Sequence, residues 1–283
     1  MQKPIPVIVG PTASGKSMFS LKVAERIDGE IINADSLQVY KDLQILSARP
    51  SQTEQNGIPH HLYGYMSANE TSSVMGWLKD VKNIINQVKK PIFIGGTGLY
   101  IKALTEGISP MPDIPEDIRE MVRNMDIEEV KSKVKECIAT DPQRLRRALE
   151  IELSTGKTFS YFQSLDKIKL IDKEFKIFFL NPPRNLLYER CDNRFIQMLT
   201  QGAIEEVKHL IDIKATGGVT KAIGVKQITK WINGEISNKE MIEEACKETR
   251  HYAKRQITWF KNQFDNKVTF TLEQMDDVLK NHF

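Results

Sequence analysis

The sequence predicts an α/β fold, in which helices cover a sheet of short and mainly parallel strands. Short apolar runs, which are typical of buried strands, recur at residues 6–9, 30–33, 91–95 and 175–180. Segments with helical periodicity, such as 74–88, separate these runs. Strands that alternate with helices usually pair in parallel, because each helix carries the chain back across the sheet.

The composition is that of an ordinary globular protein. Hydrophobic residues make up 40% of the 283 residues and charged residues 27%, without any low-complexity tract. A chain of this length can bury one good core and an appended subdomain. The net charge of +3 is too small to establish a nucleic-acid partner, since positive charge acts through local clusters rather than through its total.

The cysteines and the apolar runs predict the cellular compartment. Cys137, Cys191 and Cys246 are odd in number, widely spaced and form no C-x-x-C pair, so the sequence suggests neither a zinc site nor a disulfide framework. No apolar run is long enough to span a bilayer. We therefore expect a cytoplasmic protein that is neither exported nor anchored to a membrane.

Proline and charge patterns divide the chain into a core and an inserted lobe. Residues 110–115 contain three prolines, which break regular structure, and the stretch that follows them is charged and helix-prone. We predict a core formed by residues 1–110 and 171–283, with an inserted helical lobe at 111–170. The second part of the core is expected to be mostly helical.

One motif carries a specific chemical function. Residues 10–17 read GPTASGKS and match the pattern G-x-x-x-x-G-K-[ST], with a predicted strand before the loop and a helix after it. Backbone N–H groups of such a loop surround phosphate oxygens, Lys16 neutralises the far phosphate, and the Ser17 hydroxyl can ligate Mg²⁺. The candidate diphosphate- or nucleotide-binding residues are Gly10, Pro11, Thr12, Ala13, Ser14, Gly15, Lys16 and Ser17. The core is therefore expected to have a P-loop NTPase-like fold.

The phosphate loop by itself does not distinguish kinases, ATPases and GTPases. A phosphotransferase normally carries an aspartate at the end of a second apolar strand, but the strand at 91–95 runs into residues 96–98, which read GTG. A carboxylate occurs instead at Asp35, directly after the strand at 30–33. This places Asp35 at the edge of the sheet where the phosphate loop is also expected.

Five motifs, in order along nearly the whole chain, carry a resemblance to a known family. They are the GPTASGKS loop, ADSLQVY at 34–40, GGTGLY at 95–100, DPQRLRRALE at 141–150 and YAKRQITWF at 252–260. In these motifs the chain resembles the tRNA dimethylallyltransferases, or tRNA isopentenyltransferases, which prenylate an adenosine beside the anticodon. The segments KDLQILSARP and KAIGVKQ depart from the family pattern, which leaves details of tRNA binding and of the prenyl pocket open.

The resemblance implies transfer of a dimethylallyl group from dimethylallyl diphosphate to N6 of the adenosine at position 37 of tRNA. An aromatic amine is a poor nucleophile, so the reaction needs a base, and the family match makes Asp35 that base. The match also assigns Arg194 and the Thr12 hydroxyl to the diphosphate, with Lys16 and with Mg²⁺ at Ser17. From the residues alone, Asp35 could instead cap a helix, and Arg194 could pair with a surface carboxylate.

The same resemblance implies contacts with tRNA. A stacked base must be extruded before its N6 can react, so residues near Asp35 and the glycine-rich turn after the strand at 91–95 are expected to hold the flipped adenine. The basic run in the lobe is expected to bind the tRNA backbone, although such a run without family support is more often a solvated helix face. The candidate tRNA-binding residues are Asp35, Ser36, Leu37, Gln38, Thr97, Arg119, Gln143, Arg144, Leu145, Arg146 and Arg147.

Two other groups of residues have open roles. The helix predicted at 239–264 carries four basic residues on one stripe, which could flank tRNA, and three aromatic residues, which could stack on bases but at helical spacing are more typical of a core. These residues are Lys247, Arg250, Lys254, Lys261, Tyr252, Trp259 and Phe260. His60 and His61 are adjacent, which is the wrong spacing for a metal site on one helix face, so we interpret them as structural.

Two alternative functions remain. An adenylate isopentenyltransferase would share the loop and the base but act on a free nucleotide, and the basic lobe argues against it. A P-loop small-molecule kinase would explain the loop alone and would transfer the γ-phosphate of ATP. For the main interpretation, the expected partners are the anticodon stem-loop of tRNA and dimethylallyl diphosphate, with Mg²⁺ as cofactor, and we expect a monomer.

Overall fold

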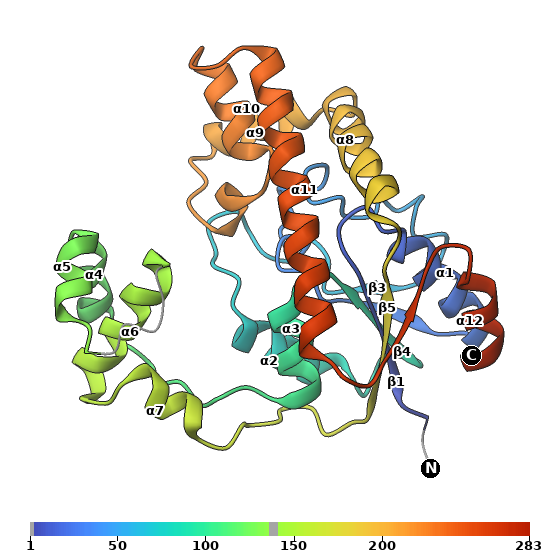
Figure 1. Ribbon diagram of the computed structural model, residues 1–283, viewed down its shortest axis with the longest axis horizontal. Helices are drawn as coiled ribbons and strands as arrows, with labels where there is room; N and C mark the ends of the chain where they lie inside the picture. The colour runs from blue at the N-terminus through green and yellow to red at the C-terminus, as the bar shows by residue number, and fades with distance from the viewer. Residues whose placement is uncertain (1–2, 136–140) are drawn as a thin grey trace. The chain divides into compact units, whose positions relative to one another are not determined.

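The structure, a computed structural model, describes residues 3–135 and 141–283. These residues form two compact units. The core unit comprises Met1–Thr105 and Leu170–Phe283, and the lobe unit comprises Glu106–Lys169 (Figure 1). The prediction that Cys137 takes part in no zinc site or disulfide lies outside the described residues.

A parallel sheet forms the centre of the core unit, as the sequence predicts. Among the described residues it has six strands in the order β3-β2-β4-β1-β5-β6. Every pair of neighbours is parallel, and the central strand β1 lies between β4 and β5. The strands are β1 (Ile5–Val9), β2 (Glu30–Asn33), β3 (His60–His61), β4 (Pro91–Gly95), β5 (Phe175–Leu180) and β6 (Lys267–Phe270).

The sequence analysis missed the two edge strands, β3 and β6. β3 has only two residues, too few to show the alternation of apolar and polar residues that identifies a strand, whereas β6 (KVTF) does alternate over its four residues and could have been predicted. In β3, His61 Nε2 lies 2.6 Å from Glu30 Oε2 of the neighbouring strand, and His60 Nδ1 lies 2.7 Å from the Ile58 carbonyl oxygen. Burial lowers the pKa of His60. These contacts agree with a structural role for both histidines.

Helices cover both faces of the sheet, because successive strand residues point to opposite sides. On one face, Phe178 packs in a cluster with residues of α1 and α12. On the other face, Phe93 contacts Trp77 of α2, and Phe179 contacts Phe260 of α11. The helices of the core unit are α1 (Lys16–Ile27), α2 (Val74–Ile84), α3 (Gly98–Glu106), α8 (Arg184–Thr200), α9 (Ala203–Asp212), α10 (Val225–Ile232), α11 (Asn238–Gln263) and α12 (Met275–His282). No helix in the described part of the chain is long and apolar enough to cross a membrane.

A separate apolar cluster joins helices α8 to α11 to the segment that follows β2. It brings Leu43 and Leu46 of this segment against Phe195 of α8, Val207 of α9 and Ile228 of α10. The segment has no helix or strand of its own, and its position therefore depends on these side-chain contacts. The same segment also lines the candidate active site.

The lobe unit contains α4 (Glu116–Asn124), α5 (Ile127–Lys133), α6 (Pro142–Thr155) and α7 (Phe159–Ser164). The sequence specifies both ends of α6. The Asp141 side chain accepts a hydrogen bond from Arg144 N at 3.0 Å, proline occupies the first helical position, and Gly156 ends the helix with a φ of 69°. The lobe has its own small core, formed by Val122, Val130, Leu145 and Leu149.

Candidate active site

The phosphate-binding loop connects the central strand β1 to α1. Ala13 and Gly15 have φ angles of 61° and 93°, and backbone in this conformation turns N–H groups toward the inside of a loop. Helix α1 begins at Lys16, so the N–H groups of its first turn have no acceptors within the helix. The loop and the helix N-terminus together form a site for an anion such as a diphosphate.

Lys16 supplies the positive charge of this loop, with its Nζ 3.3 Å from the Pro11 carbonyl oxygen. Burial lowers the pKa of Lys16 to about 8, while Asp35 raises this pKa and Arg194 lowers it further. A bound diphosphate would add negative charge next to the ammonium group and raise its pKa again. Binding of the ligand is therefore coupled to the protonation of Lys16.

We expect the affinity for dimethylallyl diphosphate to be constant near neutral pH and to fall above pH 8. Below its pKa of about 8, Lys16 already carries its proton; above that pH the free enzyme must take up a proton on binding, which lowers affinity by up to about tenfold per pH unit. The donor does not change its own charge in this range, because its last phosphate proton dissociates near pH 6. Calorimetric titration at a series of pH values measures the effect.

The matched control is Lys16→Arg, which keeps a positive charge at all these pH values. Its affinity for the donor should show no such fall. Affinity of the parent protein that stays constant well above pH 8 would contradict the coupling.

Asp35 lies two residues after the end of β2, at the carboxyl edge of the sheet. The buried Asn33 side chain fixes its backbone, because it accepts from Asp35 N at 2.9 Å and donates to the Asp35 carbonyl oxygen at 3.0 Å. Asp35 Oδ1 accepts from Leu37 N at 3.0 Å. No helix follows, so the carboxylate stabilises a turn rather than capping a helix. Among the described residues Oδ2 has no hydrogen-bond partner, and it can therefore accept a proton from a ligand.

The turn after β4 approaches the segment that carries Asp35. Thr97 Oγ1 accepts from Ser36 N at 3.0 Å, which joins these two predicted residues. The two glycines that flank Thr97 make room for α11, since a Cβ on Gly96 would lie 2.3 Å from Gln256 Nε2, and a Cβ on Gly98 would lie 2.0 Å from the indole nitrogen of Trp259.

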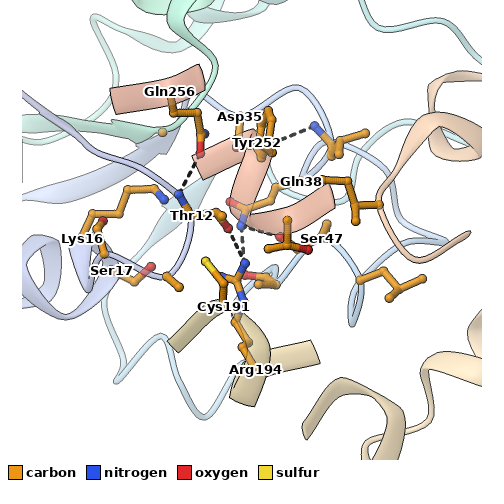
Figure 2. A pocket seen from close by; sticks show the side chains of 18 of the residues that line it. Thr12, Lys16, Ser17, Asp35, Gln38, Ser47, Cys191, Arg194, Tyr252 and Gln256 are labelled. Atoms are coloured by element: carbon orange, nitrogen blue, oxygen red, sulfur yellow. Dashed lines mark hydrogen bonds between the residues drawn. The ribbon is translucent and has the colours of Figure 1, made fainter. Parts of the chain in front are cut away.

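Thr12 is held from two sides by long side chains. Arg194 of α8 donates a hydrogen bond from Nη2 to Thr12 Oγ1, which brings together two residues that the sequence analysis assigned to the diphosphate (Figure 2). The Gln256 side chain accepts from Thr12 N at 2.8 Å and donates to the Gly96 carbonyl oxygen at 2.9 Å. Gln256 thus ties the phosphate loop to the turn after β4.

Thr12, Arg194 and Gln256 line one pocket of the core unit, which has a volume of about 160 Å³. Residues 12–17 line it, together with Asp35, Leu37, Gln38 and Arg194 from the predicted set. Typical ligand pockets measure about 300–1,000 Å³. Because Arg194 bonds to Thr12 across the loop, we expect the Arg194 side chain to move when a diphosphate occupies this space.

The pocket also contains residues that the sequence analysis did not assign to it. Gln256 and Tyr252 come from α11, Ser47 from the segment after β2, and Cys191 from α8 (Figure 2). Burial raises the pKa values of Tyr252 and Cys191, so both stay neutral near pH 7 and neither suits a base or a thiolate nucleophile. In the sequence, Gln256 could have been assigned to the site from its position in the YAKRQITWF motif.

The other basic residues of α8 and α11 have different surroundings. Arg190 lies beside the phosphate loop, since a Cβ on Gly15 would be 3.8 Å from its Nη1. Arg250 lies 2.6 Å from each carboxylate oxygen of Asp192 and is committed to that ion pair. The predicted stripe of Lys247, Arg250, Lys254 and Lys261 on α11 is therefore not a free one, because Arg250 is paired. Phe260 is fully buried and belongs to the core.

The predicted tRNA-binding residues of the lobe unit divide into buried, paired and exposed ones. Leu145 is only 2% exposed and packs in the lobe core, so its expected contact with RNA is corrected to a structural role. Arg146 donates to the carbonyl oxygens of Val122 and Arg123, at the end of α4. Arg144 is exposed at the start of α6, and no carboxylate in the described residues pairs with it.

The remaining lobe residues have acidic or backbone partners. Arg147 lies 3.3 Å from Glu150 and donates to the Pro112 carbonyl oxygen at 3.3 Å. Arg119 lies 3.7 Å from Glu116; the Arg119 side chain is partly exposed and that of Glu116 largely exposed. Gln143 is exposed on α6. The exposed ion pairs are weak and can exchange their carboxylate for a phosphate.

Comparison with protein families gives two matches. The family described as IPP transferase matches residues 38–263, and the family described as isopentenyl transferase matches residues 3–65. Among curated relatives, a tRNA dimethylallyltransferase of Rhizobium johnstonii is 43% identical over 92% of this chain and 94% of its own length. A tRNA dimethylallyltransferase of Rickettsia conorii is 41% identical over 100% of this chain and 84% of its own length.

Solved structures with a similar fold carry related names. A tRNA delta(2)-isopentenylpyrophosphate transferase from Staphylococcus epidermidis has a TM-score of 0.70 and 30% identity, over 98% of this chain and 97% of that chain. A eukaryotic dimethylallyltransferase acting on tRNA has a TM-score of 0.80 and 30% identity, over 97% of this chain and 76% of that chain.

Proposed function

The chain belongs to the IPP transferase family, and from this premise we propose that it transfers a dimethylallyl group from dimethylallyl diphosphate to N6 of adenosine 37 in tRNA. The names of its relatives favour this function over an adenylate isopentenyltransferase and over a P-loop small-molecule kinase. The observation that carries the proposal is the pocket in which the phosphate loop, Asp35 and Arg194 meet.

The arrangement of the pocket suits a substitution at the first carbon of the prenyl group. The N6–C bond forms as the C–O bond to the diphosphate breaks, and Asp35 Oδ2 accepts the proton that N6 loses. Lys16 and Arg194 stabilise the negative charge that grows on the leaving diphosphate. The Thr12 hydroxyl can donate to the oxygen that bridges the prenyl group and the diphosphate once Arg194 has turned toward the ligand.

We propose Mg²⁺ as the cofactor, which the Ser17 hydroxyl would help to hold. The described residues contain no group of three or more His, Cys, Asp or Glu side chains that could hold a metal alone. This fits Mg²⁺, which in phosphate sites is usually bound by few protein ligands, substrate oxygens and water. When bound, the ion would neutralise part of the charge on the leaving group.

The acceptor is proposed to be RNA rather than a free nucleotide. Prenylation of a base in the anticodon loop requires its extrusion, and the polar groups of Ser36, Gln38 and Thr97 lie next to the proposed base Asp35. From the lobe unit, the residues proposed to contact the tRNA backbone are Arg119, Gln143, Arg144, Arg146 and Arg147. We also propose that the protein acts as a cytoplasmic monomer, which sedimentation analysis would test.

Mass spectrometry of RNA tests the function directly. The protein is incubated with dimethylallyl diphosphate, Mg²⁺ and an anticodon stem-loop that contains a run of adenosines, and in parallel with AMP at the same concentration. We expect a mass gain of one prenyl group on a single adenosine of the stem-loop and little transfer to AMP. Efficient transfer to AMP would support the adenylate-specific alternative, and phosphate transfer from ATP to a small acceptor would support the kinase.

Substitution of Arg144 by Ala should weaken tRNA binding mainly through the loss of one phosphate contact. The slope of log binding constant against log salt concentration is then expected to fall in magnitude by about one. Affinity for dimethylallyl diphosphate should not change. Arg123→Ala, which removes an exposed lobe arginine that is paired with Glu116, is the matched control. An unaltered slope for Arg144→Ala would remove this residue from the RNA interface.

A further inference from the structure

Glu206 of α9 makes three hydrogen bonds to the backbone of the segment that follows β2. Its Oε1 accepts from Gln44 N at 2.6 Å and from Ile45 N at 2.7 Å, and its Oε2 accepts from Leu46 N at 2.9 Å. Three consecutive backbone N–H groups thus bind one carboxylate, in the way that backbone N–H groups bind an anionic ligand. Glu206 therefore fixes the backbone of residues 44–46.

The rest of the segment cannot satisfy these N–H groups. Its own turn pairs Ala48 N with the Ile45 carbonyl oxygen at 2.9 Å, and Arg49 N with the Gln44 carbonyl oxygen at 3.0 Å. The N–H groups of residues 44–46 point the other way, toward α9. Without the charged carboxylate of Glu206 they would be left without a partner inside the protein, and the turn would lose its anchor.

This segment reaches the pocket through Gln38. The Gln38 carboxamide nitrogen donates to the Ser47 carbonyl oxygen at 3.0 Å and to the Ala48 carbonyl oxygen at 2.9 Å, and Gln38 and Ser47 both face the pocket (Figure 2). Both N–H bonds of the carboxamide are thereby used. The carboxamide oxygen is left as the atom that can bind a ligand, and it accepts hydrogen bonds only, such as one from the amino group of adenine.

Side-chain packing holds in place the segment that links Glu206 to Gln38. Leu46, the last of the three residues that Glu206 holds, is buried and lines the pocket. A Cβ on Gly224 would lie 2.7 Å from Leu46 Cδ2 and 3.1 Å from Phe195 Cε2, so these groups are in close contact. A shift of residues 44–46 would therefore move Leu46 and the two carbonyl oxygens that orient Gln38.

We propose that Glu206 is a positioning residue for the acceptor base. It acts through residues 44–48 and the Gln38 carboxamide, and it has no contact with the phosphate loop. The inference rests on the proposed function, since it assigns the Gln38 side of the pocket to the adenine and the phosphate loop to the donor. Loss of Glu206 should accordingly raise the KM for the RNA acceptor and leave the affinity for the donor unchanged.

The test compares Glu206→Gln with Glu205→Gln. Glu205 is the preceding residue of α9 and is exposed, and within the described part of the chain its one ion pair is a distant one with Lys208 at 3.9 Å. For Glu206→Gln we expect the KM for an anticodon stem-loop to rise by about tenfold or more, because the glutamine has a single carbonyl oxygen for three N–H groups. The Kd for dimethylallyl diphosphate should stay within about twofold of the parent value. Glu205→Gln should change neither.

A double-mutant cycle distinguishes positioning from general destabilisation. If Glu206 acts through Gln38, the effect of Glu206→Gln on KM should largely disappear in a Gln38→Ala background. Amide hydrogen exchange of residues 43–48 provides a readout independent of activity, and it should be faster in Glu206→Gln than in Glu205→Gln. Fully additive effects, or a parallel loss of donor affinity, would overturn the inference.

The outcome is separable from that of the proposed function. Failure of the parent protein to prenylate the stem-loop contradicts the proposed function. Normal prenylation by the parent, together with an unchanged KM in Glu206→Gln, contradicts only the role of Glu206.

Discussion

Replacement of Asp35 by Asn is expected to lower the rate of prenyl transfer by about a hundredfold or more, the usual effect of losing a general base. Asn keeps the shape of the side chain and an Oδ1 that can still accept from Leu37 N, so the turn after β2 should persist. An amide, however, cannot take the N6 proton. Single-turnover rates with saturating donor and stem-loop measure the loss in the chemical step.

Two measurements control for the fold. The thermal midpoint and the affinity for dimethylallyl diphosphate of Asp35→Asn should both be close to those of the parent, because the phosphate loop does not depend on this carboxylate for its hydrogen bonds. A rate within a few-fold of the parent would mean that Asp35 only stabilises its turn, and the base would have to be sought elsewhere in the pocket.

Replacement of Arg194 by Ala is expected to slow the chemical step by about a hundred- to a thousandfold, as is typical when one preorganised donor to a developing charge is removed. Donor affinity should fall less than the rate, because the charge on the diphosphate grows as the C–O bond breaks. Single-turnover rates at saturating donor separate the rate from the affinity. Equal losses in both would assign Arg194 to uniform binding of the donor.

Arg184→Ala is the matched control for Arg194. Arg184 lies on the same helix, but its guanidinium donates to the Tyr188 hydroxyl at 2.9 Å and has no contact with the phosphate loop. Its substitution should leave the rate unchanged. An unchanged rate in Arg194→Ala itself would return this arginine to a structural role that bonds Thr12.

Most of the fold can be predicted from the sequence because the signals are local. The four inner strands are short apolar runs, and their alternation with helices predicts parallel order. The edge strand β3 has no such signal, since two residues show no period, and β6 has only a brief polar–apolar alternation over four residues rather than an apolar run. They form because β2 and β5 present unpaired edges to which a passing segment can add.

The sequence by itself predicted the residues that meet in the pocket. The loop at 10–17 is a contiguous motif whose residues need only the strand before it and the helix after it. The assignments of Asp35 and Arg194 came from family motifs, and the tertiary structure then brings Arg194 to Thr12 across 182 positions of the chain. Sequence motifs could name these residues, but not the hydrogen bond between them.

Only the tertiary structure decided which side chains support the site. Gln256 reaches Thr12 N from 244 positions away, and Glu206 reaches the backbone of residues 44–46 from about 160 positions away. It also decided that Leu145 faces the lobe core, whereas its neighbour Arg144 faces solvent. Such roles depend on the packing of distant helices against loops, and the free energy of a buried hydrogen bond exists only once both partners have left water.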